Sequence, residues 1–348
     1  MSGDKGLDYW EYFVAETERA DAPLYTQIVR GIAADSELTA LAARVQKGQP
    51  PANILLASVH YLLLRGSEHP LRTFYPNLNG GRRIEGENPF PAFKDFVSTH
   101  LTELLPLIEG GVTNTNEIAR SSALHAGFHA VARETGEPLH LIELGPSAGL
   151  NLLWDRYHVR YRRGESFLDV GPANAALTIE CELHGEKDPP TGASPSIASR
   201  VGLERNPVNL SDPAQRDWLK ALVWPDQLAR FARLEKAIEL FRANPVEIRA
   251  GDALALLPDA IAQVPEDEPL CVYHTYVVYQ MSEELREALD NILVMASLRR
   301  PIWRLSCEGS LAFVGEAPMR LRRYVGGQKR SRELAHSHPH GAWLEWRD

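Results

Sequence analysis

The sequence predicts an α/β protein, in which a helical N-terminal domain precedes an open sheet with helices on both faces. Two observations lead to this prediction. After residue 138, short apolar runs alternate with segments of helical periodicity, which is typical of parallel strands joined by helices. Before residue 113, apolar side chains recur mainly at helical spacings. A chain of 348 residues has room for both parts. We therefore expect a helical domain over 1–112 and an α/β domain over 113–348.

The N-terminal domain is expected to contain one very apolar helix. Residues 52–65 are apolar nearly all round, as in a helix that is buried on most sides. His60 within this helix is therefore predicted to pack in the core rather than to bind a ligand. Residues 80–83, two glycines followed by two arginines, favour an exposed turn over an anion-binding loop. Further helices are expected at 9–16, 38–45 and 90–105.

The α/β domain is expected to open with a helix that Asn116 caps and that ends near Glu134. A first strand at 139–144 then leads into a glycine turn at 145–149, after which helical spacing resumes. A β-hairpin-like insertion at about 158–196 is expected to lie over one edge of the sheet. Later strands are expected at 197–204, 246–250, 270–279, 302–306, 319–325 and 343–346, and helices from Asp212, over 228–241 and from Ser282. The basic segment 328–332 is expected to be a loop.

Composition narrows the class of protein. The net charge of −9 argues against general nucleic-acid binding. Three widely separated cysteines, Cys181, Cys271 and Cys307, form no Cys-x-x-Cys pair, so neither a disulfide framework nor a cysteine metal site is expected. The N-terminus lacks the apolar segment of a signal peptide, and the most apolar window is too short to span a bilayer. We expect a cytoplasmic protein that acts on small molecules, with no nucleic-acid or membrane partner and no metal.

The glycine turn is open to two chemical interpretations. Its residues Gly145-Pro-Ser-Ala-Gly149 match the Gly-x-Ser-x-Gly nucleophile elbow of α/β-hydrolases, with Ser147 as nucleophile and Asp252 as the acid of the triad. The histidine would be one of His336, His338 and His340. Everything upstream of the turn reads as helical, however, whereas that fold places several strands before the elbow. A serine hydrolase is therefore only the second alternative.

The other interpretation is a cofactor loop. Glu143-Leu-Gly145-Pro-Ser147-Ala-Gly149 resembles motif I of class I S-adenosylmethionine-dependent methyltransferases, in which an acid precedes Gly-x-Gly-x-Gly. Ser147 replaces the middle glycine of that motif. The resemblance implies a Rossmann-like methyltransferase sheet and S-adenosylmethionine as the cofactor.

The same resemblance assigns roles to residues further along the chain. In this family an acid at the end of the second strand binds the ribose hydroxyls, and an Asp after the third strand contacts the adenine; Glu204 and Asp252 have these places. A helix cap or a surface charge would explain either acid alone equally well. The fourth strand of the family ends beside the transferred methyl group, where His274 and Tyr276 lie. The residues expected at the cofactor are Asn116, Arg120, Glu143, Gly145, Ser147, Gly149, Glu204, Asp252 and Ala253.

A closer resemblance covers nearly the whole chain. The segments 115–120, 143–152, Trp224-Pro225, Gly251-Asp252, Glu308-Gly309 and 338–341 are similar to a bacterial family of uncharacterised proteins, domain of unknown function 2332. This family is grouped with methyltransferase-like folds, and the resemblance implies no particular substrate.

Together these patterns predict methyl transfer from S-adenosylmethionine to a small-molecule acceptor. His274 is the candidate base because the ordinary pKa of histidine suits proton transfer near neutrality, although alternation in its strand also allows it to be packed in the core. Tyr276 would shape the acceptor pocket or belong to the core. The first alternative is a protein that binds the cofactor or a partner without catalysis. The N-terminal helices would then form a lid or an oligomer interface. The histidines near the C-terminus favour a solvated or packed turn over a metal site.

Overall fold

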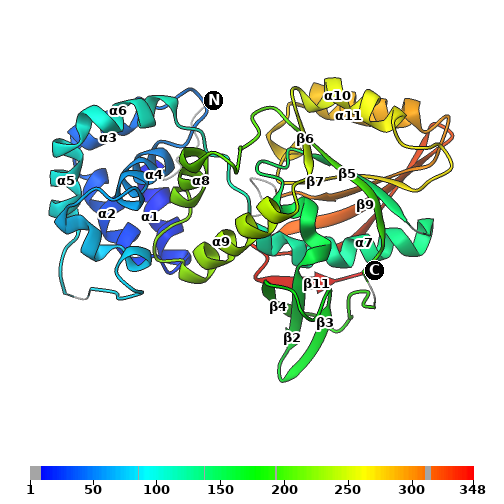
Figure 1. Cartoon of the computed structure of the whole chain (residues 1–348), viewed down its shortest axis with the longest axis horizontal. Coiled ribbons are helices and arrows are strands. Elements are labelled where there is room, and N and C mark those ends of the chain that lie inside the picture. The colour runs from blue at the N-terminus through cyan, green and yellow to red at the C-terminus, as the bar shows by residue number, and fades with distance from the viewer. Residues whose placement is uncertain (1–8, 85, 137, 193, 310–314) are drawn as a thin grey trace. The chain divides into compact units, whose positions relative to one another are not determined.

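The computed structural model describes residues 9–348, except 85, 137, 193 and 310–314 (Figure 1). It forms two compact units. The helical unit comprises Met1–Thr115 and Val208–Glu235, and the α/β unit comprises Asn116–Pro207 and Lys236–Asp348. The segment Val208–Glu235, which follows a strand in the sequence, packs with the N-terminal helices. No helix among the described residues combines the length and apolarity that crossing a membrane requires.

The helical unit is built around α4 (Pro51–Leu64), whose residues are buried on nearly every side. Its other helices are α1 (Tyr9–Arg19), α2 (Pro23–Ala33), α3 (Ser36–Ala42), the short η1 (Pro70–Phe74) and η2 (Pro76–Leu78), α5 (Phe90–Thr99), α6 (Leu101–Gly110) and α8 (Pro213–Ala221). Helix α9 (Leu228–Ala243) contributes residues to both units. His60 is fully buried, donates from Nδ1 to the Ala221 carbonyl at 3.0 Å and accepts from Asn77 at 2.9 Å. Burial lowers its pKa to about 4, which confirms a packed core histidine. The turn at 80–83 is exposed, as expected.

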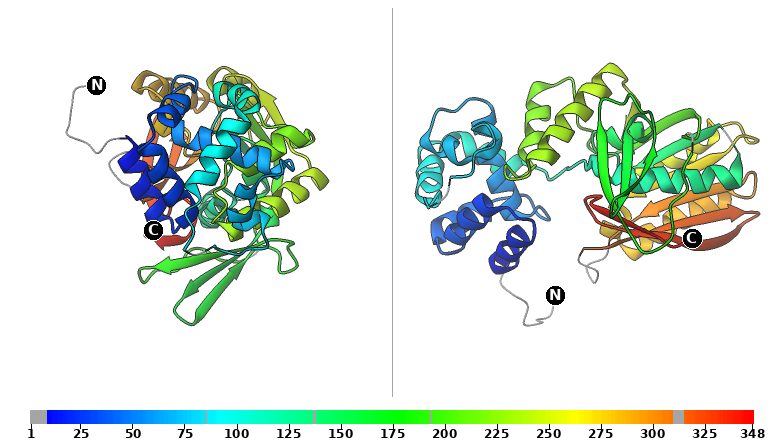
Figure 2. Two further views of the ribbon diagram at one scale, coloured as in Figure 1. Left: turned by 90° about the vertical axis from the view of Figure 1, so that its left-hand side faces the viewer. Right: turned by 90° about the horizontal axis from the view of Figure 1, so that it is seen from below.

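One 11-stranded sheet runs through the described part of the α/β unit, in the order β3-β2-β4-β11-β10-β9-β8-β7-β1-β5-β6. The strands are β1 (Leu139–Leu144), β2 (His158–Arg163), β3 (Ser166–Val170), β4 (Thr178–His184), β5 (Ile197–Glu204), β6 (Glu247–Ala250), β7 (Leu270–Thr275), β8 (Ile302–Cys307), β9 (Ala317–Val325), β10 (Gln328–Ser337) and β11 (Trp343–Trp346). The five neighbours β6, β5, β1, β7 and β8 are all parallel, so their carboxyl ends meet at one edge. The strands of the insertion extend the far side of the sheet beyond β11, and β2 and β3 form a projecting hairpin (Figures 1 and 2).

Helices cover both faces of this sheet, so the predicted α/β class is confirmed. On one face lies α7 (Ser121–Thr135), where a Cβ on Gly127 would come within 2.7 Å of Leu305 and the Phe128 ring contacts Tyr273. On the other face α10 (Ala253–Ala262) and α11 (Glu283–Ala296) pack on apolar strand residues that include Val272 (Figure 1).

Four local predictions in the α/β unit are wrong. The strand expected at 270–279 ends at Thr275, and Val278–Gln280 forms the short 3-10 helix η5. Asn116 does not cap a helix: it accepts from the Leu150 N–H at 2.9 Å, and α7 begins at Ser121 after the short η3 (Ile118–Arg120). The segment after the glycine turn is η4 (Leu150–Arg156), a 3-10 helix kinked at Leu153, rather than a regular α-helix. The expected loop at 328–332 is the first half of β10, which its backbone pairing with β9 holds in place although its side chains are exposed.

Candidate functional site

The loop Gly145–Gly149 leaves β1 at the edge where the parallel strands end. Gly145 and Gly149 have φ of 65° and 79°. A Cβ on Gly145 would lie 2.5 Å from Val277 Cγ2, and one on Gly149 would lie 2.7 Å from Ile248 Cδ1. Both positions therefore require glycine for two reasons, the left-handed backbone and the close approach of neighbouring side chains. The loop is held tightly against the segments that follow β7 and begin β6.

Ser147 has a left-handed backbone conformation, which glycine adopts more readily than other residues. Its φ is 58°, a left-handed value that costs a non-glycine residue about 1 kcal/mol. Its N–H donates to Glu204 Oε2 at 2.8 Å, and Glu204 Oε1 accepts from the Asn206 N–H at 3.1 Å. Glu204, at the end of β5, thus fixes the glycine loop. A carboxylate with two such bonds still has lone pairs for further donors.

Glu143 lies beneath this loop on β1 and is 2% exposed. The Tyr273 hydroxyl donates to its Oε2 at 3.0 Å. Burial raises the pKa of Glu143 to about 8; the charge of Glu204 adds to this rise, while Tyr273 and Arg120 oppose it. The side chain is therefore largely protonated at neutral pH, and it is a donor as well as an acceptor beside the loop.

Arg120 and Tyr276 face each other at the same edge of the sheet. The Arg120 guanidinium lies 4.2 Å from the centroid of the Tyr276 ring, a cation–π distance, and its Nε donates to the Pro339 carbonyl at 3.0 Å. Tyr276 has φ of 58° directly after β7, and its ring packs edge-on against Tyr279. Among the described residues its buried hydroxyl has no hydrogen-bond partner. The strained backbone and the unpaired hydroxyl make Tyr276 a candidate for ligand contact.

Asp252 has structural partners that explain its position. It caps α10 by accepting from the N–H groups of Leu254 and Ala255, and it pairs with Arg205 at 2.9 Å. These bonds, Arg205 first, hold the pKa of Asp252 below its usual value. The carboxylate is half exposed, so the pair with Arg205 can open at little cost. Ala253 is the first residue of α10, so its backbone lies next to the Asp252 cap.

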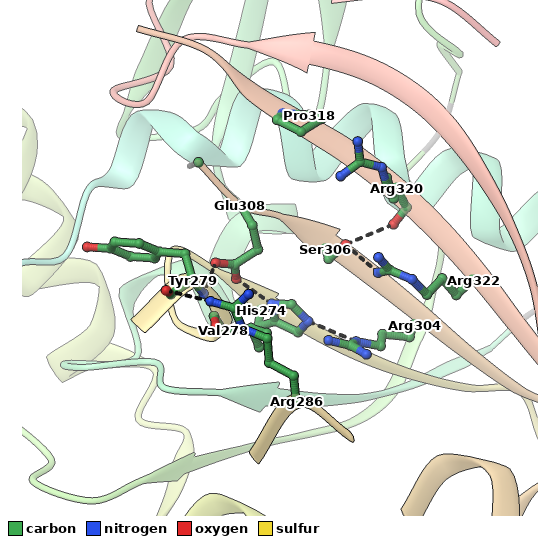
Figure 3. Close-up of a pocket in the computed structure, with 11 residues that line it drawn as sticks. His274, Val278, Tyr279, Arg286, Arg304, Ser306, Glu308, Pro318, Arg320 and Arg322 are labelled. Atoms are coloured by element: carbon green, nitrogen blue, oxygen red, sulfur yellow. Dashed lines mark hydrogen bonds and ion pairs between the residues drawn. The ribbon is translucent and has the colours of Figure 1, made fainter. Parts of the chain in front are cut away.

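His274 is not free to act as a base in this arrangement. Arg304 Nε, which can only donate, bonds to His274 Nε2 at 2.9 Å, so the imidazole proton is on Nδ1 and is donated to Glu308 (Figure 3). Because Nε2 accepts from Arg304 and carries no proton, the ring is neutral, and burial lowers its pKa. This pairing was not predicted, because Glu308 lies far from His274 in the sequence and simply follows β8. Its position one residue beyond a strand end was the available signal.

Glu308 is a partly buried carboxylate that three donors hold. Besides His274, it accepts from the N–H groups of Val277 at 3.1 Å and Tyr279 at 3.0 Å. Burial alone would raise the pKa of Glu308, but His274 and the two N–H groups outweigh burial and lower it. Glu308 therefore fixes the segment after β7 that carries Tyr276.

The structure does not assemble the triad of a serine hydrolase. His336 pairs with Glu316 at 3.0 Å and Glu333 at 2.9 Å, partners that the unpredicted strand β10 and its neighbour bring to it. His340 lies 3.4 Å from Glu117. Among the described residues Asp252 contacts none of the C-terminal histidines; its charged partner is Arg205.

The fold and these residues define a mixed α/β protein with a tight glycine loop at the carboxyl ends of parallel strands. The chain belongs to the family described as "Uncharacterized protein conserved in bacteria (DUF2332)", whose model matches residues 10–346. Searches of the curated proteins and of the solved structures found no match to the chain.

Proposed function

We propose that the α/β unit binds S-adenosylmethionine and transfers its methyl group to a small-molecule acceptor. The observation that carries this proposal is the 2.8 Å bond from the Ser147 N–H to Glu204. It joins a glycine loop after the first parallel strand to an acid at the end of its neighbour, which is where the methyltransferases that the sequence resembles bind the ribose. The order β6-β5-β1-β7-β8 supports the proposal, because it is the 3-2-1-4-5 order of a doubly wound sheet.

The hydrogen-bonding groups around the loop suit a ligand that has hydroxyls, an adenine and an amino-acid end. Glu204 retains lone pairs for ribose hydroxyls, and the backbone of the loop Gly145–Gly149 would lie beside the ligand. Asp252 and the backbone of Ala253 would face the adenine. Arg120 and Asn116 would hold the carboxylate end, because the charge of Arg120 acts on Glu143 beside the loop and Asn116 bonds to the N–H of Leu150 at its end. The cofactor would supply a methyl group on a sulfonium, and the protein would supply position and exclusion of water.

On the acceptor side we assign positioning roles. Methyl transfer is a direct displacement, so holding the two reactants in line accounts for most of the catalysis. His274 would keep Glu308 and Arg304 in place, and the ring of Tyr276 with its unpaired hydroxyl would contact the acceptor. A base role for His274 would require its bond from Arg304 to break first.

Transfer of a labelled methyl group tests the proposal. Purified protein is incubated with methyl-labelled S-adenosylmethionine and fractionated bacterial metabolites, and Glu204→Gln is the matched variant. We expect label in one fraction with the wild type and a loss of at least about tenfold with the variant. Binding of the donor without transfer into any fraction would favour the first alternative, a protein that binds the cofactor without catalysis.

One observation supports the serine hydrolase as a second candidate. The left-handed backbone of Ser147 on a turn after a strand is the conformation that a nucleophile elbow needs. Against it stands Asp252, which pairs with Arg205 rather than with a histidine. A fluorophosphonate probe decides the matter: labelling that Ser147→Ala abolishes, together with ester hydrolysis, would replace methyl transfer as the preferred function.

A further inference from the structure

A cavity of about 380 Å³ lies on the α11 face of strands β7, β8 and β9 (Figure 3). Four arginines line it. Arg304 comes from β8, Arg320 and Arg322 come from β9, and Arg286 comes from α11. The remaining lining residues are His274, Val278, Tyr279, Ser306, Glu308, Gly309 and Pro318.

The register of the sheet forces these charges together. Arg304 lies directly opposite Arg322 across β8 and β9, and Ser306 lies opposite Arg320. Residues that face each other in this way share one side of the sheet, and like charges in such a pair destabilise it. The Arg322 Nη1 donates to Ser306 Oγ at 3.0 Å, which is a neutral partner. The arrangement is therefore unfavourable unless something anionic compensates it.

The carboxylates near the cavity are already engaged. Asp290 accepts from Arg304 at 2.6 Å and also pairs with Lys329. Glu333 pairs with Arg320 at 3.2 Å. Glu308 is held by His274 and two backbone N–H groups, as described above. Each of these carboxylates is therefore already paired with another group of the protein.

Two arginines remain without a carboxylate. Arg286 donates to the carbonyls of Val278 and Tyr279 at 3.0 and 2.9 Å, and Arg322 donates to Ser306. Within the residues that the structure describes, neither has a carboxylate oxygen within 4.0 Å. Burial and then the charge of Arg304 lower the pKa of Arg322, and Tyr324 and Asp290 offset this only in part.

We infer that this cavity binds the phosphate group of a small phosphorylated molecule. A phosphate monoester carries nearly two negative charges at neutral pH, which matches the two uncompensated arginines, and its oxygens fit the planar guanidinium fork. The volume exceeds that of a phosphate and falls within the range of small-molecule pockets. Val278, Tyr279 and Pro318 provide an apolar wall for the organic part. The inference does not depend on methyl transfer, because binding here needs no methyl donor.

Calorimetric titration of the full chain with phenyl phosphate tests the inference without any S-adenosylmethionine present. Arg322→Gln and Arg286→Gln each remove one uncompensated charge. The matched control is Arg323→Gln, because Arg323 is the next residue on the same strand, lies on its opposite face and stacks on Trp303 at 5.4 Å. Benzoate and inorganic phosphate are the comparison ligands.

We expect saturable binding of phenyl phosphate that each of the two pocket variants weakens at least about tenfold, while Arg323→Gln changes it less than about twofold. Two variants at different elements guard against a folding defect in one of them. Absence of binding, or equal weakening by Arg323→Gln, would overturn the inference. Benzoate binding as tightly as phenyl phosphate would overturn the assignment to phosphate, and equal binding of inorganic phosphate would overturn the assignment to an organic ligand.

Discussion

Glu143 is buried and Glu308 is partly buried near the carboxyl ends of strands in one sheet, yet their pKa values move in opposite directions. The Tyr273 hydroxyl is the hydrogen-bond donor at Glu143, and burial there raises the pKa to about 8. At Glu308, His274 and two backbone N–H groups outweigh burial and lower the pKa. At Glu143 the interactions with Tyr273 and Arg120 do not offset burial and the charge of Glu204, whereas at Glu308 the interactions with His274 and the two N–H groups do offset burial.

This difference separates two kinds of site in the α/β unit. Around the glycine loop the buried acid is neutral at pH 7 and the charged acid, Glu204, retains free lone pairs. On the α11 face the charged acid is Glu308, which accepts from three donors. The arginines of the cavity leave an excess of positive charge there. The first region suits hydroxyl and amine groups of a ligand, and the second suits an anion.

The largest expected effect is on the pH dependence of stability. The folded pKa of Glu143, about 8, lies above its ordinary value of 4.5, so its contribution to stability is complete below pH 4.5 and is lost as the pH rises through 8. The free energy of unfolding of the wild type should therefore fall relative to that of Glu143→Gln, by up to about 4 kcal/mol between pH 5 and 9. Urea unfolding at several pH values measures this. If the free energy of unfolding of the two proteins changed equally with pH, the pKa of Glu143 would not be raised in the folded protein.

Glu308→Gln should destabilise the protein by about 2 kcal/mol at pH 7, because it removes the charge that three donors share. Glu143→Gln should change the free energy of unfolding much less at pH 6, where the native side chain is already neutral. Urea unfolding of both variants gives the contrast directly. Equal losses of unfolding free energy in the two variants would mean that the hydrogen-bond donors around them do not distinguish the two carboxyl groups.

Ser147→Gly should stabilise the protein by roughly 0.5–1 kcal/mol, since it relieves a left-handed serine while keeping the N–H bond to Glu204. Gly149→Ala is the opposing control: its Cβ would meet Ile248 at 2.7 Å, and the variant should be destabilised. Thermal unfolding of both variants is the measurement. A destabilised Ser147→Gly would indicate that the serine side chain holds the loop.

The smallest effect is expected at Arg322. Without any ligand, Arg322→Gln should stabilise the protein by roughly 0.5 kcal/mol, because it removes a like-charge pair with Arg304 across β8 and β9. Arg323→Gln, on the other face of the strand, should lack this gain. A loss of stability in Arg322→Gln would mean that its bond to Ser306 outweighs the repulsion.

Much of the fold could be predicted from the sequence because its signals are local. The buried strands β1, β7 and β8 are short and mostly apolar, and Asp212 and Ser282 cap helices as such residues usually do. Strand β10 was missed because its first half is exposed and polar, so its pairing with β9 rather than its own side chains defines it. Segment η4 was misread because its apolar spacing suits either helix type.

The candidate site was only partly predictable, because several of its features depend on pairing between distant segments. Glycine spacing located the loop, and Glu204 meets Ser147 there. The sequence did not give the register that sets Arg304 against Arg322, nor the contact between His274 and Glu308. For Asp252 the cap of α10 and the ion pair with Arg205 are structural roles that the sequence left open beside cofactor binding.

Calorimetric titration with S-adenosylmethionine and its demethylated product is the most direct test of cofactor binding at the glycine loop. Glu204→Gln keeps an acceptor for the Ser147 N–H but loses the charge, and Glu247→Gln makes the same change at the opposite end of the β5–β6 ladder. We predict binding that Glu204→Gln weakens at least about tenfold and Glu247→Gln leaves unchanged. No binding by the wild type, or equal weakening by both variants, would contradict it.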